Sequence, residues 1–437
     1  MNIRLYNANI LTMEKGKEMF EGEIWIKNDR IALIASDAFL REARGEASLP
    51  KCHFDIQLDC EKNLLMPGFK NAHTHSPMVF LRSYADELPL DTWLHKKIFP
   101  AEEKLTDSAI YEFTRLAVLE YLANGITSVF DMYICPEAVA EACIDTGMRC
   151  ALVSGLNDFT SSPEQMEEEY LKYNKIHPLI SYQMGFHAEY TCGKDLLYQV
   201  SQLVHKYHTP VYMHLSETER EVLECKKKYG MSPVVFLDSL GLFEFGGGGF
   251  HCVHVSDEDM EVLRRRRIHV ITNPSSNLKL ASGIAPIEEF MNRRIPVSIG
   301  TDGAASNNSL NLFKEMYLVS ALGKQKTGNA AAIPASKVLR MATVHGAKAM
   351  GLSKCDTLAK GKQADIIMVD LQKPNMQPMH NLVNNLVYSG STNIVKMTMI
   401  AGKILYYNGE YNIGIRPAQV YENCNRELKN MQLGEEK

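Results

Sequence analysis

The chain has 437 residues, of which 45% are hydrophobic and 23% are charged, so it is long enough to bury one large core. A net charge of −5 at pH 7 and the lack of any long apolar run exclude a protein built to grip nucleic acid or to span a membrane. Ten cysteines at irregular gaps, with no CxxC pair, indicate neither a disulfide framework nor a zinc knuckle, and we expect a cytoplasmic protein.

The first strands are expected at the N-terminus, where IRLYNANILT and GEIWIKNDRIALIA have strand-like composition and are bounded by Gly and Asn-Asp turns. The pattern returns near the C-terminus in ADIIMVDL and VKMTMIAGKILYYNGEY. We therefore predict a small β-sandwich domain formed by both chain ends, residues 1–64 and 358–437. Its last segment, from Pro417 onward, is expected to be a helix that frays into a charged tail.

Between these flanks, short apolar runs alternate with amphipathic stretches, a pattern typical of βα units around a parallel sheet. One such stretch, Thr106 to Asn124, repeats apolar residues at three- and four-residue intervals and predicts a helix. Because eight strands with crossovers favour a closed barrel over an open sheet, we predict an α/β fold with a (β/α)₈ TIM-type barrel over residues 65–357. The eight runs are LLMPGFKNA, TSVFDMY, CALVSGL, LISYQMGF, PVYMHL, GGFHCVHV, HVITNP and PVSIGTDG.

His73 and His75 stand in NAHTH at the end of the first run, where strand alternation points both side chains to one face. Two imidazoles at this spacing can share one metal ion, although paired histidines also occur in ordinary turns. Further metal-ligand types follow other runs: His214 in VYMHLSE, His251 in GFHCVH and Asp302 in SIGTDG. Because the C-terminal ends of barrel strands converge, these five residues predict one metal site at the mouth of the barrel.

Two other histidines are not expected to bind the metal ion. Strand alternation places His254 on the face opposite to His251, so we interpret it as a structural neighbour. His269 begins the seventh run and would lie at the other end of the barrel. The basic run Arg264–Arg267 follows a helical stretch with acids in its first turn, and it is expected to complement the C-terminus of that helix.

These motifs make the sequence resemble the amidohydrolase superfamily, and most closely its methylthioadenosine/S-adenosylhomocysteine deaminase branch. The resemblance covers nearly the whole chain, because the motifs match that branch in order and spacing. A motif set of this length is specific to the superfamily and less specific to one substrate. The motifs are MPGFKNAHTH, HLSETE, HCVH, NPSSNLKLASGIAP, GTDGAASNNSLNLF, GKQADIIMVD and MIAGK.

The resemblance implies both a metal-ligand set and catalytic side chains. The implied ligands are His73, His75, His214 and Asp302. Glu217 and His251 are implied as catalytic side chains that act together with Asp302. The fourth run, LISYQMGF, ends without the Lys or Glu that would bridge two metal ions, so we expect one divalent ion per subunit. Nitrogen and carboxylate ligands without a thiolate suit zinc or iron, and zinc is the expected ion.

The chemistry that follows is hydrolytic deamination. A metal ion lowers the pKa of a bound water toward neutrality. Asp302 can accept the proton of that water, and His251 can orient it. Glu217, three residues past His214, can protonate a ring nitrogen as hydroxide adds to the neighbouring carbon, after which the amine leaves as ammonia. The position of Glu217 also suits a solvated acid at a helix N-terminus.

For the substrate, the resemblance implies that Trp93, Glu102 and His187 contact a nucleoside, with Glu102 accepting hydrogen bonds from the ribose diol. Glu102 equally suits a surface acid at a helix start. The branch carries arginines after the third strand that bind the carboxylate of S-adenosylhomocysteine, whereas CALVSGLNDFTSSPEQ has Ser154 and no arginine. We therefore expect methylthioadenosine, 5′-deoxyadenosine or adenosine to be favoured over S-adenosylhomocysteine. A cation from another loop, such as Arg82, or from a partner subunit would weaken this preference.

Other functions stay open at this point. An aminohydrolase acting on guanine, a pterin or a triazine would use the same metal site with a different pocket. A non-enzymatic metal-binding protein would keep the ligand set and would not need Glu217. The expected partner is a small nucleoside or purine-like substrate, with no nucleic acid and no membrane, and we expect a homo-oligomer.

Overall fold

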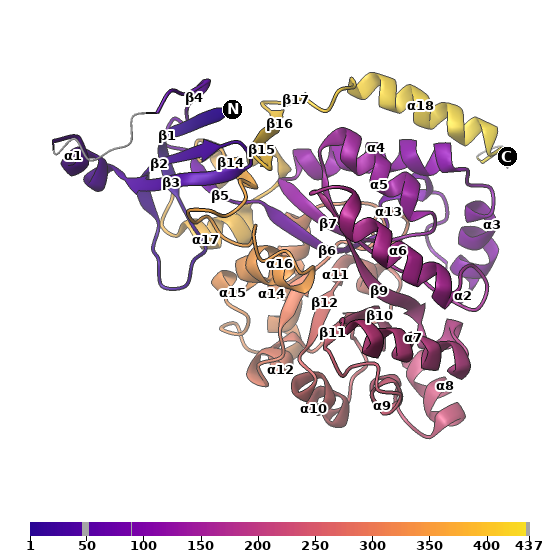
Figure 1. The fold of residues 1–437 in the computed structure, drawn as a ribbon. Helices are drawn as coiled ribbons and strands as arrows, with labels where there is room; N and C mark the ends of the chain where they lie inside the picture. The colour runs from indigo at the N-terminus through magenta and orange to yellow at the C-terminus, as the bar shows by residue number, and fades with distance from the viewer. Residues whose placement is uncertain (46–51, 89, 434–437) are drawn as a thin grey trace.

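The computed structural model describes residues 1–45, 52–88 and 90–433 and contains two sheets, one of which is wrapped by helices (Figure 1). Eight parallel strands, in the order β6 to β13, form the helix-wrapped sheet and confirm the predicted barrel. Nearly all residues of these strands are buried, as expected for a parallel sheet that is covered on both faces. The strands are β6 (Phe69–Thr74), β7 (Ile126–Met132), β8 (Arg149–Val153), β9 (Ile180–Ala188), β10 (Val211–Leu215), β11 (Gly247–His251), β12 (Ile268–Thr272) and β13 (Val297–Ile299).

The first and last barrel strands meet through a few backbone hydrogen bonds beyond the end of β13. The amides of Thr301 and Asp302 donate to the carbonyl oxygen of His73 at 3.1 and 3.0 Å. A Cβ atom at Gly300 would lie 2.7 Å from the backbone nitrogen of His73, so this close approach requires glycine. The nearly closed barrel therefore brings Asp302 directly beside His73.

Helices cover the outer face of the barrel (Figure 1). The helix predicted after Thr106 is confirmed as α4 (Asp107–Ala123), and the Thr106 hydroxyl caps it by accepting the amide hydrogen of Ala109. The basic run begins in the last turn of α10 (Asp257–Arg265), as predicted. The remaining α-helices are α1 (Asp37–Gly45), α2 (Leu90–Trp93), α3 (Phe99–Glu102), α5 (Pro136–Thr146), α6 (Pro163–Ile176), α7 (Lys194–Tyr207), α8 (Glu219–Tyr229), α9 (Pro233–Ser239), α10 (Asp257–Arg265), α11 (Pro274–Lys279), α12 (Ile287–Asn292), α13 (Ala304–Asn307), α14 (Leu312–Thr327), α15 (Ala335–Arg340), α16 (Gly346–Ala349), α17 (Leu382–Asn384) and α18 (Pro417–Asn430). Short 3₁₀- and π-helices are η1 (Ser76–Leu81), η2 (Leu94–Ile98), η3 (Glu189–Thr191), η4 (Met341–His345), η5 (Pro374–Met376), η6 (Asn385–Ser389) and η7 (Thr392–Ile394).

Strands from both chain ends form a separate mixed sheet of nine strands, in the order β17-β16-β15-β14-β5-β1-β2-β3, with β4 paired to β1. The two ends of the chain thus build one β unit beside the barrel, as the flanking patterns predict (Figure 1). Its strands are β1 (Asn2–Ile10), β2 (Phe20–Lys27), β3 (Arg30–Ser36), β4 (Ile56–Asp59), β5 (Leu64–Pro67), β14 (Ile366–Val369), β15 (Val395–Ile400), β16 (Lys403–Tyr407) and β17 (Glu410–Tyr411).

The first predicted run, LLMPGFKNA, is divided between the two sheets. Its first half, β5, pairs with β1 and β14, whereas its second half, β6, pairs with β7. The division falls at Gly68, where a Cβ atom would come within 2.1 Å of the Thr127 side chain. Because both sheets bury their part of the run completely, hydrophobicity alone does not reveal the boundary.

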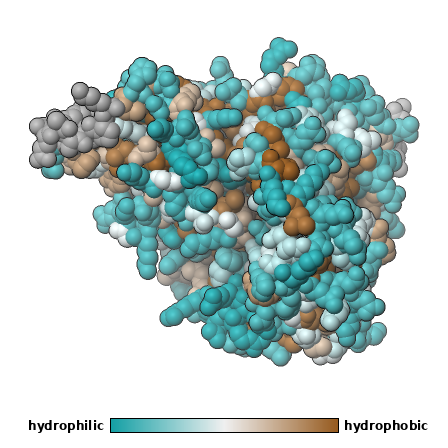
Figure 2. All heavy atoms as spheres, in the orientation of Figure 1, coloured by the Kyte–Doolittle hydropathy of each residue, from teal (hydrophilic) through white to brown (hydrophobic). Residues whose placement is uncertain are grey.

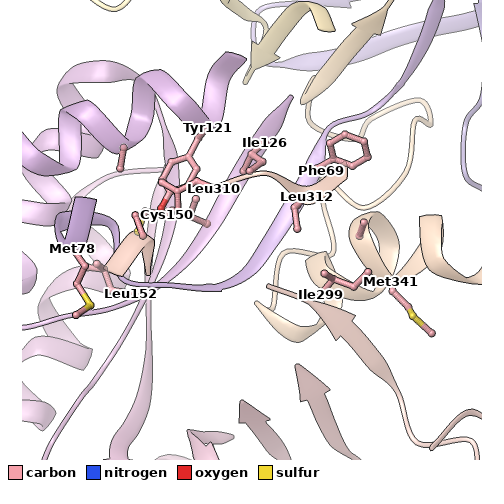
Figure 3. Close-up of a cluster of buried hydrophobic side chains, with 14 of the residues drawn as sticks. Phe69, Met78, Tyr121, Ile126, Cys150, Leu152, Ile299, Leu310, Leu312 and Met341 are labelled. Carbon is pink, nitrogen blue, oxygen red and sulfur yellow. The ribbon is translucent and has the colours of Figure 1, made fainter. Parts of the chain in front are cut away.

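The main core lies between the barrel strands and the surrounding helices. Figure 3 shows part of it, where Phe69 of β6, Tyr121 of α4 and Ile299 of β13 meet other buried side chains. A buried ionic cluster lies where the barrel adjoins the mixed sheet. The Arg149 guanidinium of β8 donates to both carboxylate oxygens of Asp365 at 2.7 and 3.0 Å, and the Lys70 ammonium lies 4.0 Å from the same carboxylate. Nothing in the sequence pattern predicts this cluster.

The surface in the orientation of Figure 1 is covered mostly by hydrophilic residues, with apolar residues in smaller groups (Figure 2). Among residues 1–45, 52–88 and 90–433, no helix is long and apolar enough to cross a membrane.

Candidate active site

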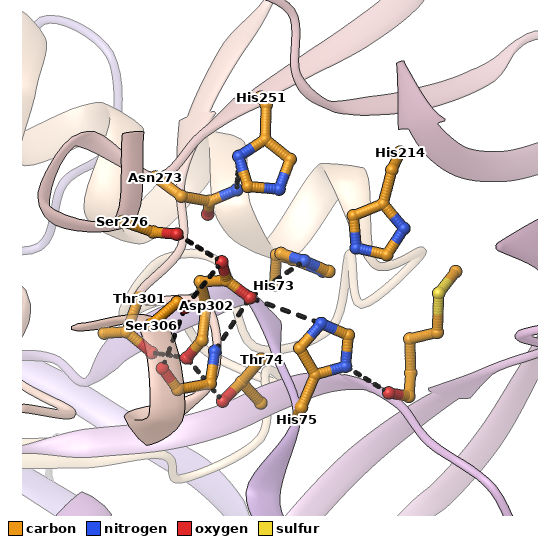
Figure 4. A network of polar contacts seen from close by, with 12 residues as sticks. His73, Thr74, His75, His214, His251, Asn273, Ser276, Thr301, Asp302 and Ser306 are labelled. Carbon is orange, nitrogen blue, oxygen red and sulfur yellow. Dashed lines mark hydrogen bonds and ion pairs between the residues drawn. The ribbon is translucent and has the colours of Figure 1, made fainter. Parts of the chain in front are cut away.

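The predicted metal ligands come together at the C-terminal ends of four barrel strands (Figure 4). His73 is part of β6, and His75 follows it as the residue before η1. His214 is part of β10, His251 is the last residue of β11, and Asp302 follows β13. The side chains of all five residues point toward one centre (Figure 4). The strand-end argument therefore predicts their juxtaposition correctly.

The distances within this group suit a single small cation. Ligand atoms of His73, His75 and His214 lie within 4.8 Å of one another, and those of His73, His251 and Asp302 form a second such set. The Nε2 atoms of His73 and His75 lie 3.5 and 3.2 Å from Oδ1 of Asp302. Imidazole nitrogens together with one carboxylate oxygen are a donor set typical of zinc.

Contacts on the far side of two rings fix their orientation. Nδ1 of His75 contacts the carbonyl oxygen of Met132, and Nδ1 of His214 lies 2.7 Å from the carbonyl oxygen of His187. A carbonyl oxygen only accepts, so each Nδ1 carries a hydrogen and Nε2 is the ring atom left for a metal ion. This is the arrangement that a metal-binding imidazole needs. Nε2 of His75 would have to give up the proton that it shares with Asp302 before it could bind that ion.

His73 is fully buried, yet neither of its ring nitrogens has a hydrogen-bond partner among the residues that the structure describes. Its ring stacks on Phe250 at a centroid distance of 3.8 Å, which holds the imidazole in place. Burial, together with the neighbouring His75, holds the pKa of His73 well below its usual value, so this imidazole is neutral. A buried neutral imidazole without a partner is costly unless an ion or a water satisfies it, and a metal ion bound at this centre would do so.

Asp302 is held by hydroxyl groups as well as by the histidines. The hydroxyls of Ser276 and Ser306 donate to its Oδ2 at 2.6 and 2.9 Å, and the Gly303 amide donates to Oδ1 at 2.8 Å. Burial opposes ionisation, but the hydrogen bond and charge of His75 outweigh it and hold the pKa of Asp302 well below its usual range. The carboxylate is therefore ionised, as a metal ligand must be.

Glu217 lies between β10 and α8 with only 8% of its surface exposed. Its Oε2 is 3.9 Å from Nε2 of His251, and its Oε1 accepts a hydrogen bond from the Ser282 hydroxyl at 3.3 Å. The role of a helix N-terminal acid belongs instead to Glu221, which accepts the amide hydrogens of Ser216 and Glu217 at 2.7 and 2.8 Å. Burial raises the pKa of Glu217, which favours a carboxylic acid able to give up a proton.

Of the three residues implied for substrate binding, His187 and Glu102 are connected to the site histidines by ring contacts, Glu102 through Tyr133. The His187 ring lies 4.8 Å from the His214 ring, and burial lowers the pKa of His187 to about 4. Glu102 accepts a hydrogen bond from the Tyr133 hydroxyl at 2.8 Å, and the Tyr133 ring lies 6.5 Å from that of His75. Trp93 is buried at the end of α2, and no hydrogen bond, ion pair or ring contact within the described ranges joins it to the histidines.

Several polar residues in contact with the site were assigned no role from the sequence. Ser276 and Ser282 lie in NPSSNLKLASGIAP and Ser306 lies in GTDGAASNNSLNLF, both of which are among the motifs that carry the resemblance. Asn277, whose Oδ1 accepts from Nδ1 of His251 at 2.7 Å, belongs to the first motif. Small hydroxyl and amide side chains are common in loops, so only their place inside long motifs could have marked them.

The chain is similar to known proteins in both sequence and fold. The model of the amidohydrolase family matches residues 64–405. A 5-methylthioadenosine/S-adenosylhomocysteine deaminase from Caldicellulosiruptor saccharolyticus is 38% identical over 410 residues, which cover 94% of each chain. A protein of the same name from Caldanaerobacter subterraneus is 36% identical over the full length of both chains. The crystal structure of an adenosine deaminase from Xanthomonas campestris with bound zinc is 30% identical, with a TM-score of 0.91 over 99% of this chain and 98% of that one.

A barrel that gathers histidines and an aspartate at the C-terminal ends of its strands defines a class of hydrolytic enzymes. The chain belongs to the amidohydrolase family, whose model and relatives span nearly all of it. The protein is therefore an enzyme, and the alternative of a non-enzymatic metal-binding protein is set aside.

Proposed function

We propose that the protein is a metal-dependent hydrolase that removes the amino group of an adenine nucleoside as ammonia. The observation that carries the proposal is a buried acid, Glu217, whose carboxyl faces His251 within the same group of side chains as Asp302. Relatives named as deaminases of methylthioadenosine and S-adenosylhomocysteine support it, as does the adenosine deaminase from Xanthomonas campestris.

In this proposal, His73, His75, His214 and Asp302 hold one zinc ion. When bound, the ion supplies a water molecule whose pKa is lowered toward neutrality. His251, whose Nδ1 is hydrogen-bonded to Oδ1 of Asn277, would orient that water through Nε2. Asp302, whose Oδ1 lies beside Nε2 of both His73 and His75, would accept the proton of the water.

The protons and bonds then balance over one turnover. Glu217 gives its proton to the ring nitrogen next to the amino-bearing carbon, while the water oxygen bonds to that carbon. Asp302 passes its proton to the amino group, the carbon–nitrogen bond breaks, and ammonia leaves. The hydroxyl proton of the adduct returns to Glu217, so the product is the inosine analogue and both carboxyl groups regain their starting state.

We further propose that neutral 5′-substituted nucleosides are favoured over S-adenosylhomocysteine. The residue after β8 is Ser154, whose hydroxyl accepts the amide hydrogen of Leu156 at 3.2 Å and carries no charge. Arg82, the cation considered from the sequence, is paired with Glu120 and donates to the carbonyl oxygen of Asn308 at 2.6 Å. An amino-acid carboxylate bound beside Ser154 would therefore meet neither the arginine that the resemblance assigns to this position nor an unpaired Arg82.

An ammonia-release assay tests both statements. We expect release from methylthioadenosine and 5′-deoxyadenosine with a kcat/KM at least ~10-fold above that for S-adenosylhomocysteine, because a missing charged partner at a desolvated site commonly costs about 2 to 5 kcal/mol. Ser154→Arg should narrow this difference. Equal or better use of S-adenosylhomocysteine would overturn the preference, and ammonia release from guanine but from no adenine nucleoside would overturn the proposed function.

A further inference from the structure

The turn that follows α11 approaches Glu217 from across the site. The backbone amide of Ser282 donates to the carbonyl oxygen of Asn277 at 2.8 Å, which closes the turn. Ala281 has a left-handed φ of 55° and Gly283 a φ of 125°, and a Cβ atom at Gly283 would lie 3.0 Å from the Val253 side chain. These φ values define one backbone conformation of the turn, in which it packs against the loop after β11.

His254 holds this turn from the side of β11. Its Nε2 lies 2.6 Å from the carbonyl oxygen of Ser282, so Nε2 carries the hydrogen and donates it. The backbone amide of His254 donates to the carbonyl oxygen of Ser216, the residue before Glu217, at 2.9 Å. His254 thus connects the Ser282 turn to the backbone that carries Glu217. Strand alternation predicts that His254 lies on the face opposite to His251. That argument does not apply here, because β11 ends at His251 and both His251 and Cys252 have left-handed φ values.

The hydroxyl of Ser282 is directed at only one of the two carboxyl oxygens of Glu217. It lies 3.3 Å from Oε1, whereas Oε2 faces Nε2 of His251 at 3.9 Å. Ser282 is 6% exposed and Glu217 is 8% exposed, so water competes little for this contact. A carboxyl group whose two oxygens have different neighbours is held in one rotation.

We infer that Ser282 and His254 are positioning residues for proton transfer by Glu217. Ser282 donates to Oε1 and leaves Oε2 as the oxygen that carries the transferable proton, and His254 fixes Ser282 through its backbone carbonyl. Without the hydroxyl the carboxyl group can rotate, and its proton then points away from the ring nitrogen in part of the population. The inference rests on the proposed function, because it assigns the geometry of the same acid.

Ser282→Ala, His254→Leu and their conservative counterparts Ser282→Thr and His254→Gln test this inference with methylthioadenosine as substrate. We expect Ser282→Ala and His254→Leu to lower kcat about tenfold with less than a twofold change in KM and with unchanged metal content. Ser282→Thr keeps a hydroxyl and His254→Gln keeps a donor, so both should recover most of kcat. Ser201→Ala is a matched control, because it removes a buried serine hydroxyl that donates to the Leu240 carbonyl oxygen, far along the chain in α7.

A double-mutant cycle separates positioning from general damage to the fold. If Ser282 acts through Glu217, adding Ser282→Ala to Glu217→Gln should cause no further loss of kcat. An equal further loss in the Glu217→Gln background, or an unchanged kcat in Ser282→Ala, would overturn the inference while the deaminase activity of the natural protein stands. A natural protein that releases no ammonia from adenine nucleosides would instead overturn the proposed function and the inference with it.

Discussion

His73 is the candidate ligand whose hydrogen-bonding atoms are left unsatisfied. It is fully buried, and both ring nitrogens are without hydrogen-bond partners in the described part of the chain. His269 is a useful contrast, because it is also a barrel histidine with an unpartnered Nδ1 but lies near the start of β12, away from the other ligands. His269 is also only partly buried, and unlike His73 it belongs to no group of neighbouring ligand atoms among the described residues.

We predict that His73→Ala and Asp302→Ala each lower bound metal well below one ion per chain and abolish ammonia release, because each removes a ligand and leaves the ion under-coordinated. His269→Gln, the matched control, should keep its metal. Elemental analysis of folded protein measures the outcome. Full metal occupancy in the His73→Ala or Asp302→Ala protein would remove that residue from the ligand set.

At this scale the sequence predicts well which candidate ligands come together, and it predicts poorly the residues that orient them. His73 and His214 lie near the ends of apolar strands and Asp302 follows one, and the convergence of strand ends in a barrel brings them together. Ser282 meets Glu217 across 65 positions of sequence, through a turn whose left-handed residue is Ala281. No local pattern announces an alanine in that conformation, so the contact could not be predicted.

Helices as well as strands hold the residues at the mouth of the barrel in place. Glu315 of α14 is fully buried, and it accepts the amide hydrogen of Ser275 at 3.0 Å and the side-chain amide of Asn307 at 2.9 Å. It thereby joins α14 to α11 and α13, the elements that supply Ser276 and Ser306 to Asp302. The division of one apolar run into β5 and β6 belongs to the same scale, since a helix or strand pattern gives no information on which sheet takes each half.

Burial raises the pKa of Glu315 from 4.5 to about 7. The folded protein therefore binds a proton more readily than the unfolded chain between these values, and this group makes the free energy of unfolding fall as pH rises through that window. Glu315→Gln removes the titration, so the difference in unfolding free energy between natural protein and variant should fall with pH, by at most about 1.4 kcal/mol per pH unit. Denaturant unfolding at several pH values, with metal content held constant, measures it. Parallel pH profiles would contradict the prediction.

The whole molecule consists of a barrel and a mixed sheet that share a buried ionic contact. Arg149 of β8 forms a buried ion pair with Asp365, the residue before β14. Nearby, the Lys70 ammonium donates to the Thr127 hydroxyl at 2.6 Å. Short strand-like runs at both chain ends predict that the two ends form one β unit, and eight apolar runs predict the barrel. The ionic contact was not predictable, because a lone arginine or aspartate in an apolar stretch does not identify its partner.

We predict that Arg149→Met lowers the free energy of unfolding by about 3 to 5 kcal/mol, because it leaves the buried Asp365 carboxylate without its main partner. Combining it with Asp365→Asn should destabilise the protein by less than the sum of the two single changes. Arg264→Met, which breaks an exposed pair with Glu261, should cost less than about 1 kcal/mol. Equal effects of Arg149→Met and Arg264→Met in denaturant unfolding would show that the buried contact does not stabilise the junction.

The central claim is that this site adds water to an adenine ring and expels ammonia. The most direct measurement incubates the zinc-loaded protein with methylthioadenosine in ¹⁸O-labelled water and follows ammonia and product mass together. The proposed function predicts one ammonia released per product and one ¹⁸O atom on the purine ring, with the rate of both falling to a small residual value in Glu217→Gln protein that retains its metal. A product without ¹⁸O on the ring, or near-natural turnover in Glu217→Gln, would contradict it.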